Sequence, residues 1–183
     1  MSLQSDAPIV LVATRTTCED FHQNVNQKEI IEVGLCLFEP SSGRKYEPVS
    51  VFVKTAKKKI SKHCQAITGI SQKDSDGGVS LDIAFEFFED VYDTKKYTWG
   101  SYGHFTKEAL ESGAKAKNVK LPFGLNYINI QKEYSATLNY HAECGMKTAL
   151  SMLGLKNISN LSCEDEVLNL GIIYNEILKK GRK

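Results

Sequence analysis

The first place along the chain where catalytic or metal-binding side chains are expected is the end of a short apolar run near the amino terminus. Residues 9–12 are predicted to form a buried strand, because the run is short, apolar and bounded by Pro8 and by the polar residues 14–17. The end of such a strand presents its side chains to a site. The two positions there that share a face are Ala13 and Arg15, a methyl group and a permanent cation. Neither can act as a general base or hold a divalent metal ion.

Two further strands are predicted to follow this run. Residues 29–38 form the second strand, and the turn sequence Pro40-Ser41-Ser42-Gly43 leads into a third strand at residues 46–54. Strands joined by such short connections make a three-stranded antiparallel meander.

Five short blocks then follow one another along nearly the whole chain. They are Thr16-Thr17-Cys18-Glu19, residues 29–34, residues 60–72, Gly100-Ser101-Tyr102, and residues 127–130. In order and spacing these blocks resemble the DEDDh (DnaQ-like) 3'-5' exonucleases, and most of all the branch that trims histone-mRNA ends and small RNAs. The resemblance implies an α/β, ribonuclease-H-like exonuclease fold. In that fold a mixed five-stranded sheet, the antiparallel meander plus parallel strands, is flanked by helices.

The chemistry of that family depends on four acidic residues and a histidine. The carboxylates hold two divalent cations about 3.5–4 Å apart, and the histidine serves as general base for the attacking water. The matching positions in this chain form a vestigial set, in which only the last keeps its acidic side chain: Ala13, Arg15, Gly103, Asn160 and Asp165. The resemblance therefore implies an exonuclease-like domain without a catalytic site and without a metal cofactor.

Neighbouring acidic residues do not restore the set. Adjacent side chains on a strand point to opposite faces, and on a helix they diverge by about 100°, so a slip of one residue does not rebuild a metal site. Arg15 is expected to lie where a metal ion would be and to pair with Asp165. The competing expectation is that Arg15 stays free to contact a phosphate.

Zinc is a further alternative that the sequence leaves open. Three pairs of cysteine and histidine lie close together in the sequence and resemble pairs of zinc ligands: Cys18 with His22, His63 with Cys64, and His141 with Cys144. Ordinary buried thiols are the favoured interpretation, because His63 and Cys64 diverge on a helix and Cys18 and Cys64 match positions where the active family also has cysteine.

Composition fits one intracellular domain. The 183 residues are 42% hydrophobic, carry a net charge of +1 and include five cysteines without paired spacing, which fits reduced thiols in the cytoplasm or nucleus. We expect a disordered or cloning-derived N-terminus at residues 1–8, a single exonuclease-like domain at 9–179 and a basic tail at 180–183. No apolar segment is long enough to indicate a membrane partner.

Helices are expected where apolar residues recur at helical spacing. The predicted ranges are 61–68, 80–91, 106–117, 144–153 and 163–179, with a further strand at 97–101. In the helix at 80–91, the core face is expected to centre on Ile83, Phe87 and Val91, widened by Leu81, Phe85 and Phe88.

Nucleic-acid binding is expected from local rather than global charge. Lysines gather in the loop before residue 61, and the resemblance implies that residues near the first motif and the Thr-Gly-Ile turn hold a 3' end. The candidate binding residues are Thr16, Thr17, Ile67, Thr68, Lys57, Lys58 and Lys59.

The sequence supports one main functional hypothesis with two versions. The chain is an inactive exonuclease-like module of RNA metabolism, acting either on a protein partner in an RNA-processing complex or on single-stranded RNA 3' ends. The alternative is a working 3'-5' exoribonuclease using Mg2+ or Mn2+ at a displaced site, which requires convergence of Glu19, Glu164, Asp165 and His104.

Overall fold

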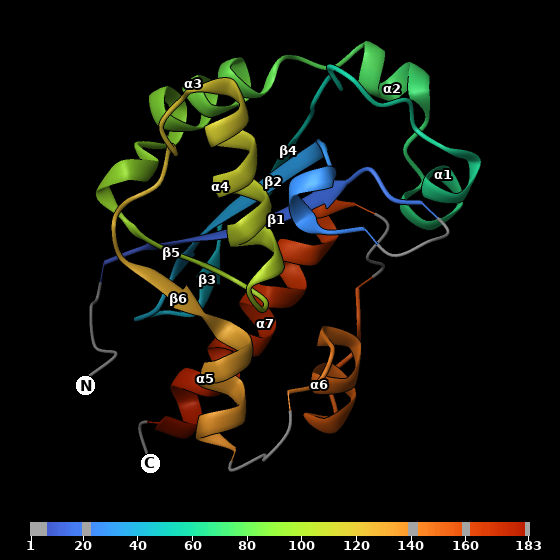
Figure 1. The fold of residues 1–183 in the computed structure, drawn as a ribbon. Helices are drawn as coiled ribbons and strands as arrows, with labels where there is room; N and C mark the ends of the chain where they lie inside the picture. Colours follow the sequence, from blue (N-terminus) through green and yellow to red (C-terminus); the bar gives the residue numbers. More distant parts are fainter. Residues whose placement is uncertain (1–6, 20–22, 139–142, 159–161, 182–183) are drawn as a thin grey trace.

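The computed structural model describes residues 7–19, 23–138, 143–158 and 162–181. One mixed sheet runs through the centre of the molecule, with helices on both faces (Figure 1). Along the sheet the strand order is β3-β2-β1-β5-β6, and β4 also pairs with β2. The strands are β1 (Ile9–Thr16), β2 (Ile30–Glu39), β3 (Arg44–Lys45), β4 (Val49–Phe52), β5 (Thr98–Ser101) and β6 (Tyr127–Asn129).

The strand pairing confirms the predicted α/β class and its mixed sheet. β2 lies antiparallel to β1, β3 and β4, whereas β1, β5 and β6 are mutually parallel neighbours. The sheet has six strands rather than the five predicted, because the third strand of the meander is divided into β3 and β4. Pro48 lies in the interruption, and proline has no backbone N–H to donate to a ladder.

All five predicted helices are present. They are α1 (Lys62–Thr68), α3 (Leu81–Tyr92), α4 (Phe105–Lys117), α6 (Met146–Met152) and α7 (Cys163–Gly181). Ser61 caps α1, since its hydroxyl accepts a hydrogen bond from the Cys64 backbone N–H. The helical elements that were not predicted are all short: α2 (Gln72–Asp76), α5 (Ile130–Thr137), η1 (Val25–Gln27) and η2 (Thr94–Lys96). Within the described ranges, no helix has the length and apolar character needed to cross a membrane.

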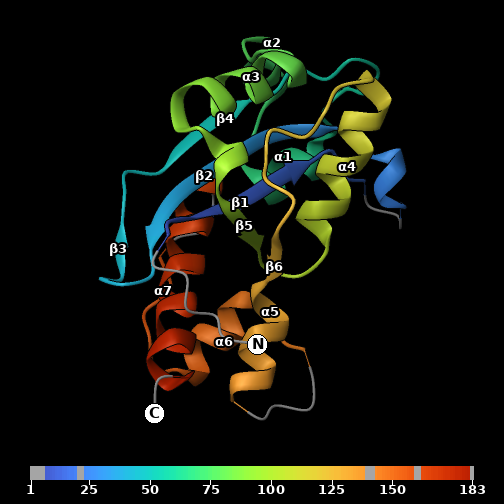
Figure 2. The same ribbon diagram turned by 90° about the vertical axis from the view of Figure 1, so that its left-hand side faces the viewer.

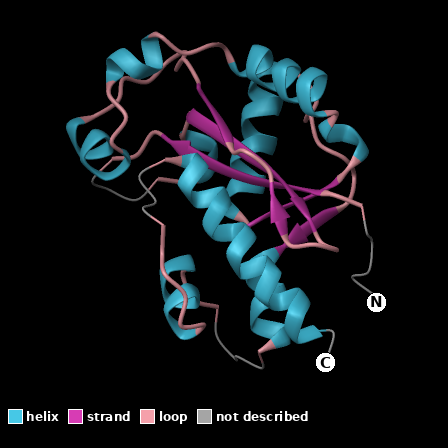
Figure 3. Ribbon diagram, turned by 180° about the vertical axis from the view of Figure 1, so that it is seen from behind, coloured by secondary structure: helices cyan, strands magenta, loops and turns pink. Residues whose placement is uncertain are grey.

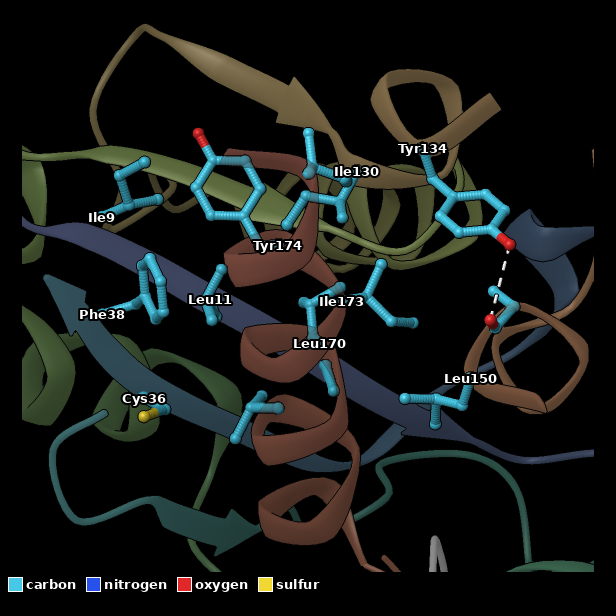
Figure 4. Packing of buried hydrophobic residues seen from close by; sticks show 14 of the residues in the cluster. Ile9, Leu11, Cys36, Phe38, Ile130, Tyr134, Leu150, Leu170, Ile173 and Tyr174 are labelled. Atoms are coloured by element: carbon cyan, nitrogen blue, oxygen red, sulfur yellow. Dashed lines mark hydrogen bonds between the residues drawn. The ribbon is translucent and has the colours of Figure 1, made fainter. Parts of the chain in front are cut away.

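Two apolar cores lie on opposite faces of the sheet. On one face the residues of β1 that include Leu11 and Ala13 pack against α5, α6 and α7, with Leu170 and Ile173 of α7 at the centre (Figure 4). On the other face Val10 and Val12 pack against α3 and α4. Figures 2 and 3 show α7 running across the sheet on the face opposite α4. Because successive side chains of β1 point to opposite faces of the sheet, only every second residue of this strand packs against α7.

The predicted centre of the α3 core face is wrong, whereas the three residues predicted to widen that face are buried. Ile83, Phe87 and Val91 are exposed, while the buried residues are Leu81, Ala84, Phe85 and Phe88. Apolar residues cover most of the circumference of α3, so periodicity alone did not identify the side that faces the sheet.

Candidate functional site

Three positions of the vestigial set, Ala13, Arg15 and Asp165, lie at the carboxyl end of β1 and in the first turn of α7. Ala13 is fully buried and belongs to the core beneath α7. It pairs with Gly34 of β2, and a Cβ atom added to Gly34 would lie only 2.5 Å from the Cβ atom of Cys163. Glycine at position 34 thus allows the first residue of α7 to contact the sheet directly.

Arg15 lies two residues further along β1 and points to the same side as Ala13. Its Nη1 atom is 2.9 Å from Oε2 of Glu166, in an ion pair whose side chains are only 19% and 21% exposed. Its Nη2 atom also donates to the Ser162 carbonyl at 3.4 Å. The guanidinium is therefore held against the first turn of α7 by charge and by a hydrogen bond.

The predicted partner of Arg15 was Asp165, and this prediction is wrong. Cys163 and Val167 of α7 face the sheet core, and Glu166, three residues after Cys163, lies on that same face. Asp165 is turned by about 100° from Glu166. Its backbone N–H donates to the Ser162 hydroxyl at 3.1 Å, which caps the helix.

A second carboxylate, Glu32, completes the charged cluster. Glu32 is buried opposite Arg15 in the β1–β2 register, and both of its carboxylate oxygens accept from the Cys163 backbone N–H at 3.3 Å. A carboxylate at this position satisfies a free N–H at the start of α7 and interacts favourably with the helix dipole. Burial raises the pKa of the Glu166 carboxyl, Glu32 raises it further, and Arg15 opposes both effects.

Gly103 occupies the remaining described position of the set, after the end of β5. Its φ of 77° is left-handed, and its carbonyl accepts from the Tyr127 hydroxyl at 2.7 Å and from the Ser101 hydroxyl at 3.2 Å. These two hydroxyls fix a tight turn that glycine adopts without steric cost. The turn leaves no side chain directed at the charged cluster.

These residues do not fit a pair of divalent cations. Ala13 and Gly103 have no donor atoms, and Arg15 contributes a positive charge; Asn160 lies outside the described residues. Glu164, a proposed substitute, instead accepts from the backbone N–H and hydroxyl of Ser50. In the described ranges, no three His, Cys, Asp or Glu side chains come together as a metal site.

The cysteines near this site lie in environments that keep them as thiols. Burial is the main cause that raises the pKa of Cys163 well above its ordinary value, and it also raises the pKa of Cys18 to about 11. The Cys64 sulfur is buried and directed at the Thr16 carbonyl at 3.7 Å. His22 and His141, which figured in the zinc alternative, lie outside the described residues.

Among the residues expected to bind a 3' end, the threonines have structural contacts. Thr16, Thr17 and Thr68 are buried. The Thr17 hydroxyl accepts from the Glu29 backbone N–H at 3.0 Å, and the Thr68 hydroxyl donates to the Cys64 carbonyl at 2.8 Å. In contrast Ile67, on the same helix as Thr68, is 60% exposed and presents an apolar side chain to solvent.

The loop that carries Lys57, Lys58 and Lys59, which we call the lysine loop, is held in place by hydrogen bonds. The Glu29 carboxylate accepts from the backbone N–H groups of Ala56, Lys57 and Lys58, at distances from 2.7 to 3.3 Å. This carboxylate fixes the loop and directs Lys57 and Lys58 to one hollow of about 430 Å³, whereas Lys59 is exposed outside its lining.

This hollow adjoins a second one, of about 650 Å³, and the two share Asn26 and Lys28. Together they follow one face of α4, from Phe105 near Gly103 to Ala116 and Lys117 near its end, a length of about 17 Å at 1.5 Å per residue. We call this the lysine groove. It is lined by four lysines and two glutamates: Lys28, Lys57, Lys58, Lys117, Glu29 and Glu108.

Phe105 stands at the end of the lysine groove nearest the vestigial set. Its ring is 41% exposed, and Lys28 Nζ lies 5.2 Å from the ring centroid. Sequence reasoning missed Lys28, Lys117 and Phe105, since they are distant along the chain from the lysine loop. Their only local signal is that Phe105 lies two residues after Gly103, which itself follows the block Gly100-Ser101-Tyr102.

Comparisons with known proteins agree with this fold. The nuclease domain of 3'hExo, described as a DEDDh family member bound to rAMP, superposes with a TM-score of 0.86 at 21% identity, covering 95% of this chain and 92% of that chain. Cell-death related nuclease 4 gives a TM-score of 0.85 at 19% identity, over 95% and 64% of the two chains. E. coli exonuclease I in complex with a dT13 oligonucleotide gives a TM-score of 0.74 at 10% identity, over 96% and 42% of the two chains.

No family model matches this sequence, and neither does any curated protein. The structural neighbours are nucleases, one of which is described as a DEDDh family member, and at these identities the likeness shows the fold. The chain has an α/β exonuclease fold whose central charged cluster is built from Arg15, Glu32 and Glu166.

The Arg15–Glu166 pair is expected to stabilise the fold more than a surface pair does. Replacing Arg15 by alanine leaves Glu166 beside Glu32 without its cation, and we expect a loss of about 2–4 kcal/mol in the free energy of unfolding at neutral pH. Lys179→Ala, which breaks the exposed pair with Glu176, is the matched control and should cost about 0–1 kcal/mol. Urea denaturation measures both. Equal, small losses would contradict a structural role for Arg15.

The raised pKa of Glu166 predicts a defined pH dependence. The folded protein holds the Glu166 proton to higher pH than the unfolded chain does. The stability that this proton contributes is therefore complete below the unfolded-chain pKa and is lost as the pH rises through the folded pKa. We expect the free energy of unfolding to fall with pH over this interval more steeply in the native protein than in Glu166→Gln. Glu176→Gln should keep the native slope. A Glu166→Gln variant with an unchanged slope would contradict the assignment.

Proposed function

We propose that this chain is a catalytically inactive 3'-5' exonuclease-like domain that binds single-stranded RNA. The observation that carries the first half is the Arg15–Glu166 ion pair, which places a guanidinium in the charged cluster beside Glu32. A permanent cation there neutralises carboxylates that could otherwise attract metal ions. With Ala13 and Gly103 in place of donors, the two-cation chemistry of the exonucleases has no ligand set.

The lysine groove supports the second half of the proposal. Its four lysines outnumber its two glutamates, and it runs from an exposed aromatic ring along α4. Proteins that bind single strands combine a positive groove along the backbone with aromatic rings on which bases stack. We assign Phe105 the stacking role and Lys28, Lys57, Lys58 and Lys117 the phosphate contacts, whereas Lys59 and Ile67 are exposed but do not line the groove.

The structural neighbours are consistent with such a ligand. One of them is described as bound to rAMP, another in 3'-end specific recognition of a histone mRNA stem-loop, and a third with a dT13 oligonucleotide. We propose a single-stranded RNA 3' end as the ligand here, with the buried Thr16, Thr17 and Thr68 supporting the backbone around the site. The domain would act inside the cell, in the cytoplasm or nucleus, alongside a protein partner in an RNA-processing complex.

A displaced active site has less support. Glu19, Glu164, Asp165 and His104 would have to converge, yet the carboxylate of Glu164 is engaged by Ser50 on β4, and Asp165, in the first turn of α7, lies on a different face from Glu166. We therefore do not assign an exoribonuclease activity to Asp165.

RNA binding should depend on the lysine groove and proceed without cleavage. Fluorescence anisotropy with a short, end-labelled single-stranded RNA should show that Lys57→Glu/Lys58→Glu weakens binding by roughly tenfold or more at low salt. Phe105→Ala should weaken it by about 1–3 kcal/mol. Lys147→Glu, an exposed lysine on α6, is the matched control and should bind as the native protein does.

The same samples test the absence of catalysis. After incubation in Mg2+ or Mn2+, gel analysis should show RNA of unchanged length. RNA shortening that disappears in Asp165→Ala would overturn the proposal that the domain is inactive. The RNA-binding proposal would be overturned if Lys57→Glu/Lys58→Glu and Phe105→Ala both bound RNA as tightly as the native protein.

A further inference from the structure

Helix α3 presents a row of apolar side chains to solvent. Ile83, Phe87 and Val91 are 49%, 36% and 58% exposed, and their spacing of four residues aligns them as one ridge along the helix. The buried side of α3 is formed by other residues, and Phe87 of the ridge touches the core through ring contacts with Phe88 and Tyr92. Both Figure 1 and Figure 2 place α3 at the edge of the molecule, away from α7.

An acidic row lies beside this ridge. At about 100° per residue, Glu86 and Asp90 lie immediately to one side of Ile83 and Phe87, and the remaining acidic residues continue the row. The helix contains no lysine or arginine. Its acidic residues are Asp82, Glu86, Glu89 and Asp90, followed by Asp93 at the C-cap.

The two central carboxylates of that row are available to a partner. Glu89 pairs with Lys95, and Asp93 lies 3.7 Å from Lys96, both beyond the end of the helix. Glu86 and Asp90 are exposed, and they take part in no ion pair among the residues that the structure describes. We call Ile83, Phe87, Val91, Glu86 and Asp90 together the α3 face.

We propose that the α3 face binds an amphipathic helix of a partner protein, with an apolar ridge and lysines or arginines along one flank. A ridge of residues four apart fits the groove between the same ridges of a second helix. The apolar ridge of the partner covers Ile83, Phe87 and Val91, and its basic flank pairs with Glu86 and Asp90. This interaction is separate from the lysine groove, since none of its residues lines that groove.

Charge decides between this occupant and two others. A second copy of the chain packed antiparallel through α3 would bring the two acidic rows onto the same side of the interface, where like charges repel. RNA phosphates would be repelled by the same carboxylates. A basic helix is the occupant whose charge complements the face.

Two synthetic helical peptides test the proposal by calorimetry on the full chain. Both have leucines four residues apart, and they differ only in carrying lysines or glutamates along the flank. The lysine peptide should bind at least tenfold more tightly than the glutamate peptide, and more weakly as salt rises. Equal binding of both peptides, or binding of neither, would overturn the proposal.

Variants of the protein then locate the interaction. Phe87→Ser should reduce lysine-peptide binding by roughly tenfold, and Glu86→Lys/Asp90→Lys should reverse the preference in favour of the glutamate peptide. Met152→Ser removes a comparably exposed apolar side chain from α6 and should change nothing. Thermal unfolding checks that each variant is folded. A dimer seen by light scattering that is lost in Phe87→Ser would assign the face to self-association and overturn the proposed partner.

Discussion

The seating of α7 on the sheet depends on charge balance in one small cluster. Arg15 and Glu32 stand opposite each other on β1 and β2, and α7 begins directly above them. Glu32 satisfies the N–H group of Cys163, and Arg15 pairs with Glu166 one turn later. Because Gly34 allows the helix to approach the strands, removing the cation would leave two carboxylates close together in a buried space.

This arrangement offers a physical account of how an exonuclease fold can persist without metal. In a two-cation site, the ions balance the carboxylates that surround them. Under the proposed function, the Arg15 guanidinium supplies the positive charge in this chain, and Ala13 and Gly103 stand at positions where the family resemblance implies carboxylates. Since charge balance in this proposal requires no metal ion, we propose binding functions for the surfaces of the domain. The lysine groove and the α3 face carry opposite charges and suit different partners.

Much of the fold was predictable because its signals are local. The capped helix at Ser61 and the meander strands follow from short-range rules, and the mixed sheet followed from the resemblance of the motif blocks. The face of α3 was not predictable, since apolar residues such as Ile83 and Phe85 occupy both sides of the helix and only the sheet's position decides between them. The extra strand arose from Pro48, a residue whose effect on the meander could have been foreseen.

The site was predicted less completely than the fold. The direction of Arg15 into the charged cluster followed from the family resemblance, but its partner was misassigned by one residue. The periodicity of α7, with Cys163 and Val167 buried, contains the information that would have selected Glu166. In the lysine groove, Lys57 and Lys58 were expected, whereas Lys28 and Lys117 join them only through tertiary folding. The sequence around Lys28 and Lys117 does not indicate that these residues line a groove.

The central claim is that Arg15 takes the place of metal in this fold. The most direct test is a crystal structure of the native protein soaked in Mn2+ with a short single-stranded oligonucleotide, with anomalous scattering used to locate the ion. The account predicts no manganese peak at the start of α7 and a guanidinium still paired with Glu166. A manganese ion held by Asp165, with Arg15 turned into solvent, would contradict it.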